Sequence, residues 1–466
     1  MAKRTHRVFT FKKAAHLSSV LTLCVILSGC AYLPQSVTER DVSSALSMPE
    51  EFQAQELPGS QIIDGLLSVF DDEKLNALVE QSLRHNLNIQ LAAKQLEEAG
   101  FNANAQWGNA LPQVNGNLST SRSQGAQGKA EGTYSPSLDV SWEIDIWGKL
   151  RNQRESLDAT ALANAENYQA INDSIAGQVM QSWFDVVTAK SLIDLEQSRL
   201  SNLQKSAQNS RWQYQSGLAN LDDLSAIQRD IAQTKATLAA NTDNHNTAVR
   251  SLKILMGQYP DSHIALDYTL PALVSSPTSG VPAHLLTNRP DLRSAWQNVV
   301  AADKSVTVAH KDMFPTLVLT GSLGTQSNVF SDLMSGATIW SLANNITVPI
   351  FNDKQLENNM HAAQSRAEQA WLIYLQTALI AFQEVEQTLN RETLLADQER
   401  QQQDAVLHAE ETRRVFEDRY KNGLISILEY LNAQNTVFNM KSQLIQIRNE
   451  RLKNRIALAL ALGKGV

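Results

Sequence analysis

The side chain with the clearest covalent chemistry in the sequence is the thiol of Cys30. It ends the segment Leu27-Ser28-Gly29-Cys30, which follows a basic start and an apolar run from Ala14 to Leu27. This run is typical of a secretory signal and is shorter than a membrane-spanning helix. Small residues at positions 28 and 29 let a peptidase reach the backbone, and a thiol accepts a diacylglyceryl group. We therefore predict that Cys30 is lipidated and that the signal peptide, residues 1–29, is removed.

The Cys30 segment resembles the signal box of bacterial lipoproteins, in which the new amino end is also acylated. The alternative is a plain signal peptide with a chance cysteine. The second cysteine, Cys24, lies in the segment that is removed, so the mature chain has no disulfide of its own. An acyl anchor holds a protein on a membrane without an attractive charge patch. Ala31 follows the cysteine, and in enteric-type bacteria a residue other than aspartate at this place favours sorting to the outer membrane.

Residues for other chemistry are sparse in this chain of 466 residues. It contains no Gly-x-Ser-x-Gly, no His-Glu-x-x-His and no phosphate-binding glycine loop, and its nine histidines and eight methionines are scattered. The acidic run from Asp71 to Glu73 is predicted to cap a helix and not to bind a metal. We expect no catalytic residues, no metal site and no cofactor. The net charge of -8 argues against a nucleic-acid partner.

The second half of the chain repeats the first at a shift of 206 residues. Asp223 lies opposite Glu429 in this register, and near a shift of 203 Leu111-Pro112 matches Phe314-Pro315. A single register over some forty residues exceeds chance, so we predict an internally duplicated chain. The identical pairs include Tyr214/Tyr420, Gly217/Gly423, Leu218/Leu424, Gln228/Gln434 and Gly257/Gly463.

Each copy contains a long stretch of good helix formers without proline. We predict two hairpins of long helices, about 148–256 with its turn at Gly217 and about 352–462 with its turn at Gly423. Outgoing helices of this length would be about 100 Å long, which suits a coiled coil better than a compact globule. Apolar residues recur at intervals of seven in the second copy: Leu424, Leu431, Phe438, Ile445 and Leu452.

A pair of alternating segments precedes each hairpin, at about 113–147 and about 315–351. In the first pair Asp139, Glu143 and Asp145 alternate with apolar residues. We predict membrane β-strands, with these three acids lining the lumen of a barrel. A face of a soluble β-sandwich would alternate in the same way. Because four strands cannot close a barrel, and open strand edges are not tolerated in lipid, the barrel hypothesis requires several chains.

These features resemble the outer-membrane factor family, the TolC-like group, and within it the lipid-anchored outer-membrane components of resistance-nodulation-division efflux pumps. The resemblance rests on the lipoprotein signal, the two copies of strand pair and hairpin, and the fragments Arg419–Leu424 and Asn288–Leu292. It implies a mainly helical fold with membrane β-strands, a trimeric barrel with four strands from each chain, and a helical tunnel across the periplasm. It also implies a periplasmic adaptor and an inner-membrane pump as partners, and a passive duct that catalyses no reaction.

The resemblance also implies an aperture at the hairpin ends, where acidic residues just past the turn ring the narrow end. Glu429 stands at this place in the second hairpin, and Asp223 with Asp222 beside it in the first; Tyr420 matches a tyrosine that latches neighbouring helices. Three copies of Glu429 near an axis would repel one another and attract cations. The alternative is that these acids are solvated residues at a helix start. Two positions depart from the best-known latch pattern: Ile425 and Asn432.

The sequence leaves two other protein classes open. One is a periplasmic adaptor of the same pumps, although an adaptor has one hairpin and this chain has two. The other is a lipid-anchored coiled-coil protein without a pore. The cargo is not indicated. The predicted division is a signal peptide at 1–29, an anchor segment at 30–70, a first repeat at 71–259, a linker at 260–288 and a second repeat at 289–466.

Overall fold

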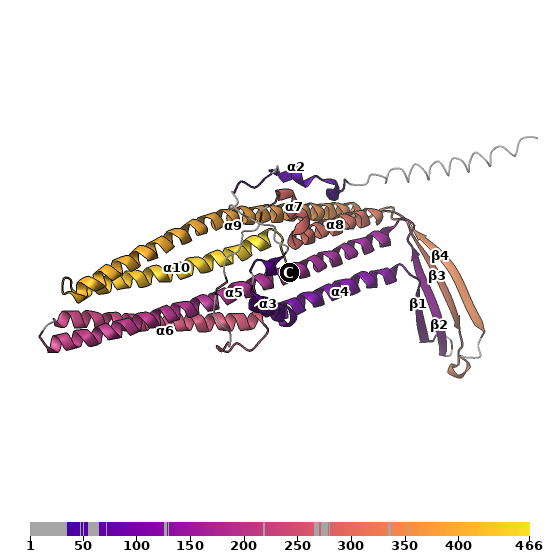
Figure 1. Ribbon diagram of the computed structural model, residues 1–466. Helices are drawn as coiled ribbons and strands as arrows, with labels where there is room; N and C mark the ends of the chain where they lie inside the picture. The colour runs from indigo at the N-terminus through magenta and orange to yellow at the C-terminus, as the bar shows by residue number, and fades with distance from the viewer. Residues whose placement is uncertain are drawn as a thin grey trace, which may run out of the picture. The chain divides into compact units, whose positions relative to one another are not determined.

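The computed structural model describes residues 35–46, 48–49, 51–54, 65–70, 72–124, 128, 130–217, 220–264, 270–271, 278, 280–333, 337–352 and 354–466. In these residues one order of elements occurs twice: two helices, two strands and two long helices (Figure 1). The first set is α3 (Glu73–His85), α4 (Leu87–Asn109), β1 (Gln113–Ser123), β2 (Glu131–Ile144), α5 (Lys149–Gln215) and α6 (Leu221–Leu255). The second set is α7 (Pro282–Asn288), α8 (Pro290–Lys311), β3 (Thr316–Thr325), β4 (Thr338–Thr347), α9 (Gln355–Lys421) and α10 (Ile427–Ala461). Shorter elements are η1 (Val37–Glu39), α2 (Val42–Leu46), η2 (Leu66–Ser68) and η3 (Phe330–Asp332).

The long helices of the two sets have equal lengths. α5 and α9 each contain 67 residues, and α6 and α10 each contain 35. Lys149 and Gln355, where α5 and α9 begin, lie 206 positions apart, the register in which the sequence repeats. The predicted fold class, mainly helical with a four-stranded sheet, is confirmed.

The described residues form two compact units, each described by itself. The first contains the described part of Met1–Val42, Leu96–Asn164 and Ser294–Leu375. The second contains the described parts of Ser43–Gln95, Ala165–Arg293 and Gln376–Val466.

The sheet of the first unit is antiparallel, with the strand order β1-β2-β3-β4. Because side chains alternate along each strand, the register gives the sheet one apolar and one polar face. Two neighbouring rows of paired residues show this: Val114, Val140, Gly321 and Leu342 on the apolar face, and Asn115, Asp139, Ser322 and Ser341 on the polar face.

The strands end earlier than the sequence alternation predicts. β2 ends at Ile144 and β4 at Thr347, so the expected continuation of the strands to 147 and 351 is wrong. Pro349 follows β4 closely, and proline has no N–H to donate to a strand ladder. Asp145 lies one residue beyond β2, where its carboxylate accepts hydrogen bonds from the start of α5.

The main core of the second unit lies where the segment 65–70 and α3 pack against the long helices. The rings of Phe70 and Phe184 pack in a T-shaped arrangement, with 5.1 Å between centroids. α3 begins at an N-cap, Asp72, whose carboxylate accepts hydrogen bonds from the amides of Lys74 and Leu75 at 3.0 and 3.1 Å. The cap predicted within residues 71–73 is therefore Asp72. The core includes Leu66, Leu75, Val179, Met180, Val249, Leu252, Leu452 and Ile456.

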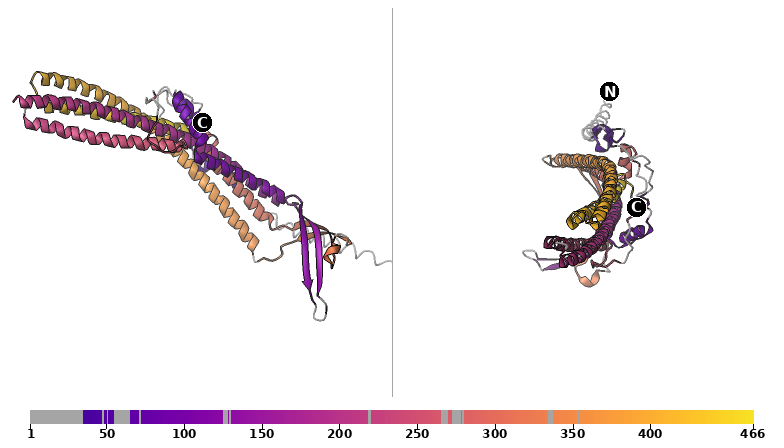
Figure 2. Two further views of the ribbon diagram at one scale, coloured as in Figure 1. Left: turned by 90° about the horizontal axis from the view of Figure 1, so that it is seen from below. Right: turned by 60° about the vertical axis from the view of Figure 1, so that its left-hand side comes forward.

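The two hairpins lie side by side in the second unit, with their turns at the same end (Figure 1 and Figure 2). A second apolar cluster joins them near the turns, where residues of α5 and α6 pack against residues of α10. The cluster consists of Leu203, Ala207, Ile227, Ile231, Ile427 and Leu431.

A buried charge network joins α9 to α10. Glu392, which is 1% exposed, accepts hydrogen bonds from Arg455 at 2.7 Å and from Arg451 and Asn454 at 3.1 Å. Arg451 also contacts Glu399 at 2.9 Å. The first hairpin has apolar residues at the positions 206 residues earlier: Val186 matches Glu392, Ile193 matches Glu399 and Val249 matches Arg455. The two hairpins therefore share one backbone pattern but differ in the chemistry of their interiors.

We expect Glu392→Val to destabilise the protein by about 3–5 kcal/mol, because it leaves Arg455 buried without its carboxylate. The double variant Glu392→Val/Arg455→Val, which has the valines of the first hairpin at both positions, should lose less stability than the single variant. Thermal unfolding of the purified protein measures both. Glu450→Val is the matched control, since its ion pair with Arg391 is exposed and should contribute little. A double variant less stable than the single one would contradict this account.

Candidate functional site

Glycines in the left-handed conformation make the turns between the long helices. Gly217 has φ 74° and Gly423 has φ 69°, and an added Cβ would meet no atom within 4 Å at either position. At the second turn the amide of Leu424 donates to the carbonyl of Arg419 at 2.9 Å, and the amide of Gly423 donates to that of Tyr420 at 3.0 Å. This pair of bonds is a Schellman motif, which ends helices at a left-handed residue. The turns thus lie at the two glycines that the sequence indicates.

Glu429 holds the start of α10. The carboxylate of Glu429 accepts hydrogen bonds from the amide of Ser426 at 2.8 Å and from its hydroxyl at 2.9 Å, while the Ser426 hydroxyl accepts one from the Glu429 amide at 3.3 Å. This reciprocal pair is a capping box. The bonds from Ser426 lower the pKa of Glu429, so the exposed side chain carries its charge at neutral pH. Its aperture role stays a prediction.

The equivalent acids of the first hairpin are Asp222 and Asp223. Both lie in the first turn of α6, where negative charge is favourable at a helix start. Asp222 is exposed and Asp223 is half-buried. The structure therefore places acids at the same end of both hairpins. The departures Ile425 and Asn432 lie there too, half-buried and exposed respectively.

Tyr420 packs within its own hairpin and reaches the other one. Its ring stacks on Tyr430, with 5.7 Å between centroids and 3° between planes, and its hydroxyl lies 3.5 Å from Oε1 of Gln213 on α5. Beside it, Glu417 pairs with Arg413 at 2.7 Å and with Lys421 at 2.8 Å. This charged ladder was missed in the sequence, although its spacing of four residues is a recognisable helical pattern.

The three predicted lumen acids have different surroundings in the first unit. The carboxylate of Asp139 accepts hydrogen bonds from the side chains of Asn117 at 2.5 Å and Ser137 at 2.9 Å. Glu143 pairs with Lys149 at 2.8 Å. Asp145 caps α5, as described above. Asp139 and Glu143 lie on the polar face of the sheet, and Asp145 lies beyond it; a lumen position for any of them stays a prediction.

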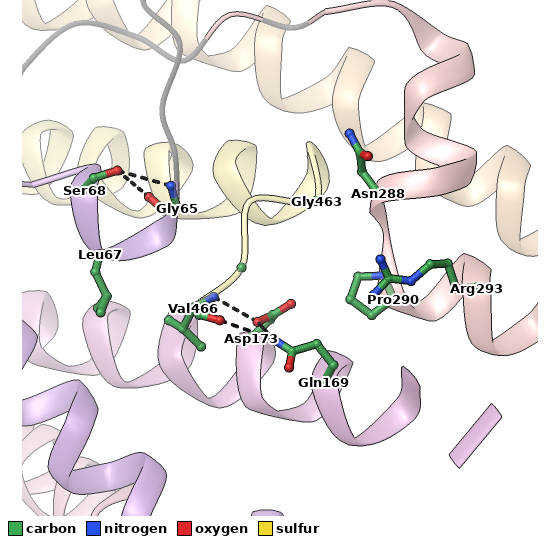
Figure 3. A pocket seen from close by; sticks show the side chains of 11 residues that line it. Gly65, Leu67, Ser68, Gln169, Asp173, Asn288, Pro290, Arg293, Gly463 and Val466 are labelled. Atoms are coloured by element: carbon green, nitrogen blue, oxygen red, sulfur yellow. Dashed lines mark hydrogen bonds between the residues drawn. The ribbon is translucent and has the colours of Figure 1, made fainter. Parts of the chain in front are cut away.

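A cavity of about 690 Å³ in the second unit lies around residues 463–466 (Figure 3). Asp173 accepts hydrogen bonds from the amide of Val466 and from the side chain of Gln169, both at 3.0 Å. Burial raises the pKa of Asp173. Opposite it, Arg293 is held by Glu166. Both charged groups thus have partners within the protein, and this cavity gives no indication of a ligand.

Two predictions fall outside the described residues, the lipidation of Cys30 and the signal peptide. Leu218, which is paired with Leu424 in the sequence repeat, also lies outside them. Within the described ranges, none of the helices has both the length and the apolar composition to cross a membrane. The same part of the chain shows no group of three His, Cys, Asp or Glu residues arranged to hold a metal ion.

Together, a four-stranded sheet with one apolar and one polar face and two long helical hairpins joined near their turns define the fold of TolC-like outer-membrane channels. The family model for outer membrane efflux proteins matches residues 78–258 and 281–464 of this chain. The chain therefore belongs to the outer membrane efflux protein family, whose members form channels, and it is an outer-membrane efflux channel that extends into the periplasm.

Individual relatives match nearly the whole chain. The cation efflux system protein CusC of Escherichia coli K12 is 27% identical over 457 residues, covering 96% of this chain and 99% of CusC. The solvent efflux pump outer membrane protein SrpC of Pseudomonas putida is 26% identical over 450 residues, covering 94% of this chain and 91% of SrpC. A crystal structure of CusC has a TM-score of 0.83 at 26% identity and covers 93% of this chain and 99% of its own. The open state of the Neisseria gonorrhoeae MtrE channel also has a TM-score of 0.83, at 24% identity, covering 93% of this chain and 98% of its own.

We expect Gly423→Ala to weaken the second turn by about 1–2 kcal/mol, because a Cβ is disfavoured in the left-handed conformation. Hydrogen exchange of residues 424–430 should become faster. The matched control is Gly100→Ala in α4, where the added Cβ also meets open space but the backbone is helical. That variant should be neutral or slightly stabilising. Equal effects of the two variants would contradict the role given to Gly423.

Proposed function

We propose that three copies of this chain form a lipid-anchored exit duct of a tripartite efflux system. Each copy would contribute four strands to one outer-membrane barrel and two hairpins to one periplasmic tunnel. A periplasmic adaptor and an inner-membrane pump of the resistance-nodulation-division type would deliver the solutes. The acylated Cys30 would hold each chain in outer-membrane lipid.

The observation that carries this proposal is the sheet with two open edges. β1 and β4 each pair with one neighbour in the described chain. The apolar face is exposed as well: Trp340 is 73% and Leu342 67% exposed. Lipid can cover an apolar face, but unpaired backbone groups at a strand edge are too costly to leave in lipid. Pairing of β4 with β1 of the next copy satisfies both edges.

The helices next to these edges support the same arrangement. α4 leads into β1, and α9 follows β4. In the first unit Phe101 on α4 is 65% exposed and Leu372 on α9 is 61% exposed, and Trp107 and Ile373 on the same two helices are also exposed. Large apolar side chains gathered on both flanks of one unit suit an interface between successive copies.

The names of the relatives indicate different cargos, since CusC belongs to a cation efflux system and SrpC to a solvent efflux pump. A duct driven by a separate pump has no need of a tight site for its cargo. Selectivity would instead arise from charge along the lumen and at the narrow periplasmic end. Glu429, with Asp223 and Asp222, would form that end.

The trimer is tested by the native mass of the protein extracted from outer membranes in mild detergent. The expected protein mass is three times that of the mature chain, because the proposed barrel contains four strands from each of three copies. A monomer, or a protein released whole when its lipid is cleaved, would show that the strands do not share a barrel.

The aperture is tested by Glu429→Lys in the reconstituted channel. We expect the preference for K⁺ over Cl⁻, measured from the reversal potential in a KCl gradient, to fall because three negative charges become positive. Glu429→Gln separates charge from capping, since glutamine also completes a capping box. It should lower selectivity less than Glu429→Lys and leave the turn intact. Unchanged selectivity in both variants would remove Glu429 from the aperture.

A further inference from the structure

The polar face of the sheet carries charge of one sign. The strand register places Glu131, Asp139 and Glu143 on this face, and within the described strands no lysine or arginine lies there. The apolar face carries one charged side chain in the same strands, Arg122, paired with Gly132 near the connecting loop. A lumen lined by this polar face would therefore be negative along the strands.

One cation reaches this face at the end nearest the helices. Nζ of Lys149, the first residue of α5, lies 2.8 Å from Oε1 of Glu143 and 3.8 Å from Oδ1 of Asp312. Lys149 and Glu143 also line a polar cavity of about 400 Å³, together with Gln113 and Ser141 of the same face. One ammonium is thus shared by two carboxylates, which leaves the cluster with a net negative charge.

The position of Lys149 is fixed by the way α5 begins. The carboxylate of Asp145 accepts hydrogen bonds from the amides of Leu150 at 3.1 Å and Arg151 at 2.9 Å, so the first turn of the helix is held against the end of β2. Burial, with the nearby charge of Glu143, raises the pKa of Asp312, as expected when two carboxylates lie close together. The three charged side chains of the cluster are therefore held together by the backbone at the junction between the sheet and the helices.

We propose that Lys149 sets the cation selectivity of the channel at this junction by offsetting the charge of Glu143 and Asp312. This inference rests on the proposed function, because it needs three chains around one lumen. Three clusters would carry a net charge of about -3 with the lysines and about -6 without them. Rings of acidic side chains favour cations in other pores. Lys149 weakens that preference and keeps the junction passable to solutes of other charge.

The test uses the full-length channel reconstituted in a planar bilayer, with the reversal potential measured in KCl gradients. Lys149→Gln should raise the permeability ratio of K⁺ to Cl⁻ by about twofold or more near 0.1 M salt. The shift should shrink near 1 M salt, where the screening length falls from about 10 Å to about 3 Å. Lys149→Arg should behave as the wild type. Glu143→Gln, which keeps the lysine, should shift selectivity in the opposite direction.

Arg122→Gln is the matched control, because it removes one positive charge per chain from the apolar face. It should leave the permeability ratio unchanged. The inference is overturned if Lys149→Gln shifts the ratio no more than Arg122→Gln, or if Glu143→Gln shifts it in the same direction as Lys149→Gln. A wild-type protein that forms no conducting pore would instead overturn the proposed function, so the two failures are distinguishable.

Discussion

The constraint on which this structure depends is the need to pair every backbone group of a strand placed in lipid. The described part of the chain contains four strands, and their register separates an apolar face from a polar one. Within this part, β1 and β4 each have one partner. An amphipathic sheet with open edges is stable neither in water nor in lipid. The exposed aromatic and aliphatic residues on α4 and α9 continue the same incomplete surface along the flanking helices. These features are those expected of the proposed arrangement, in which several copies close one wall.

The two hairpins have helices of the same lengths, as the repeat predicts, but the side chains in their interiors differ. In the first hairpin Val186 and Val249 belong to an apolar core, whereas Glu392 and Arg455 at the matching positions form a buried ion pair. If α10 took the place of α6 beside α5, Arg455 would lie opposite Val186, the residue that matches Glu392 in the repeat. An uncompensated buried charge costs several kcal/mol, so the pair penalises this exchange of partners. A duplicated chain needs such a distinction, because its helices are otherwise interchangeable in length and turn geometry.

Features that depend on neighbouring residues in the sequence were predictable. Gly217 and Gly423 end helices because of their own backbone freedom, and Asp72 caps α3 through bonds to residues two and three positions away. Strand ends were less predictable, since alternation continues through Asp145 although its carboxylate is engaged by α5. The Glu392 network was missed because its partners lie about sixty residues apart. The role of Lys149 was also missed, because its contact with Asp312 depends on how the two repeats pack.

The two ends of each hairpin are constrained differently. At the turns, Gly217 and Gly423 have open space around them. At the other ends, a Cβ on Gly257 would lie 2.4 Å from the carbonyl oxygen of His85, and one on Gly463 would lie 3.1 Å from the backbone of Asn288. The adjacent side chains reinforce this contact, because Asn86 donates to the carbonyl of Leu255 at 2.8 Å and Arg289 to that of Ala461 at 3.2 Å. Each hairpin is thus fixed at its base by backbone contacts, while near the turns the described parts of the two hairpins are joined only through side chains, in the apolar cluster that includes Ile227 and Ile427. Any movement of one hairpin relative to the other at the turn end would therefore have to separate this cluster.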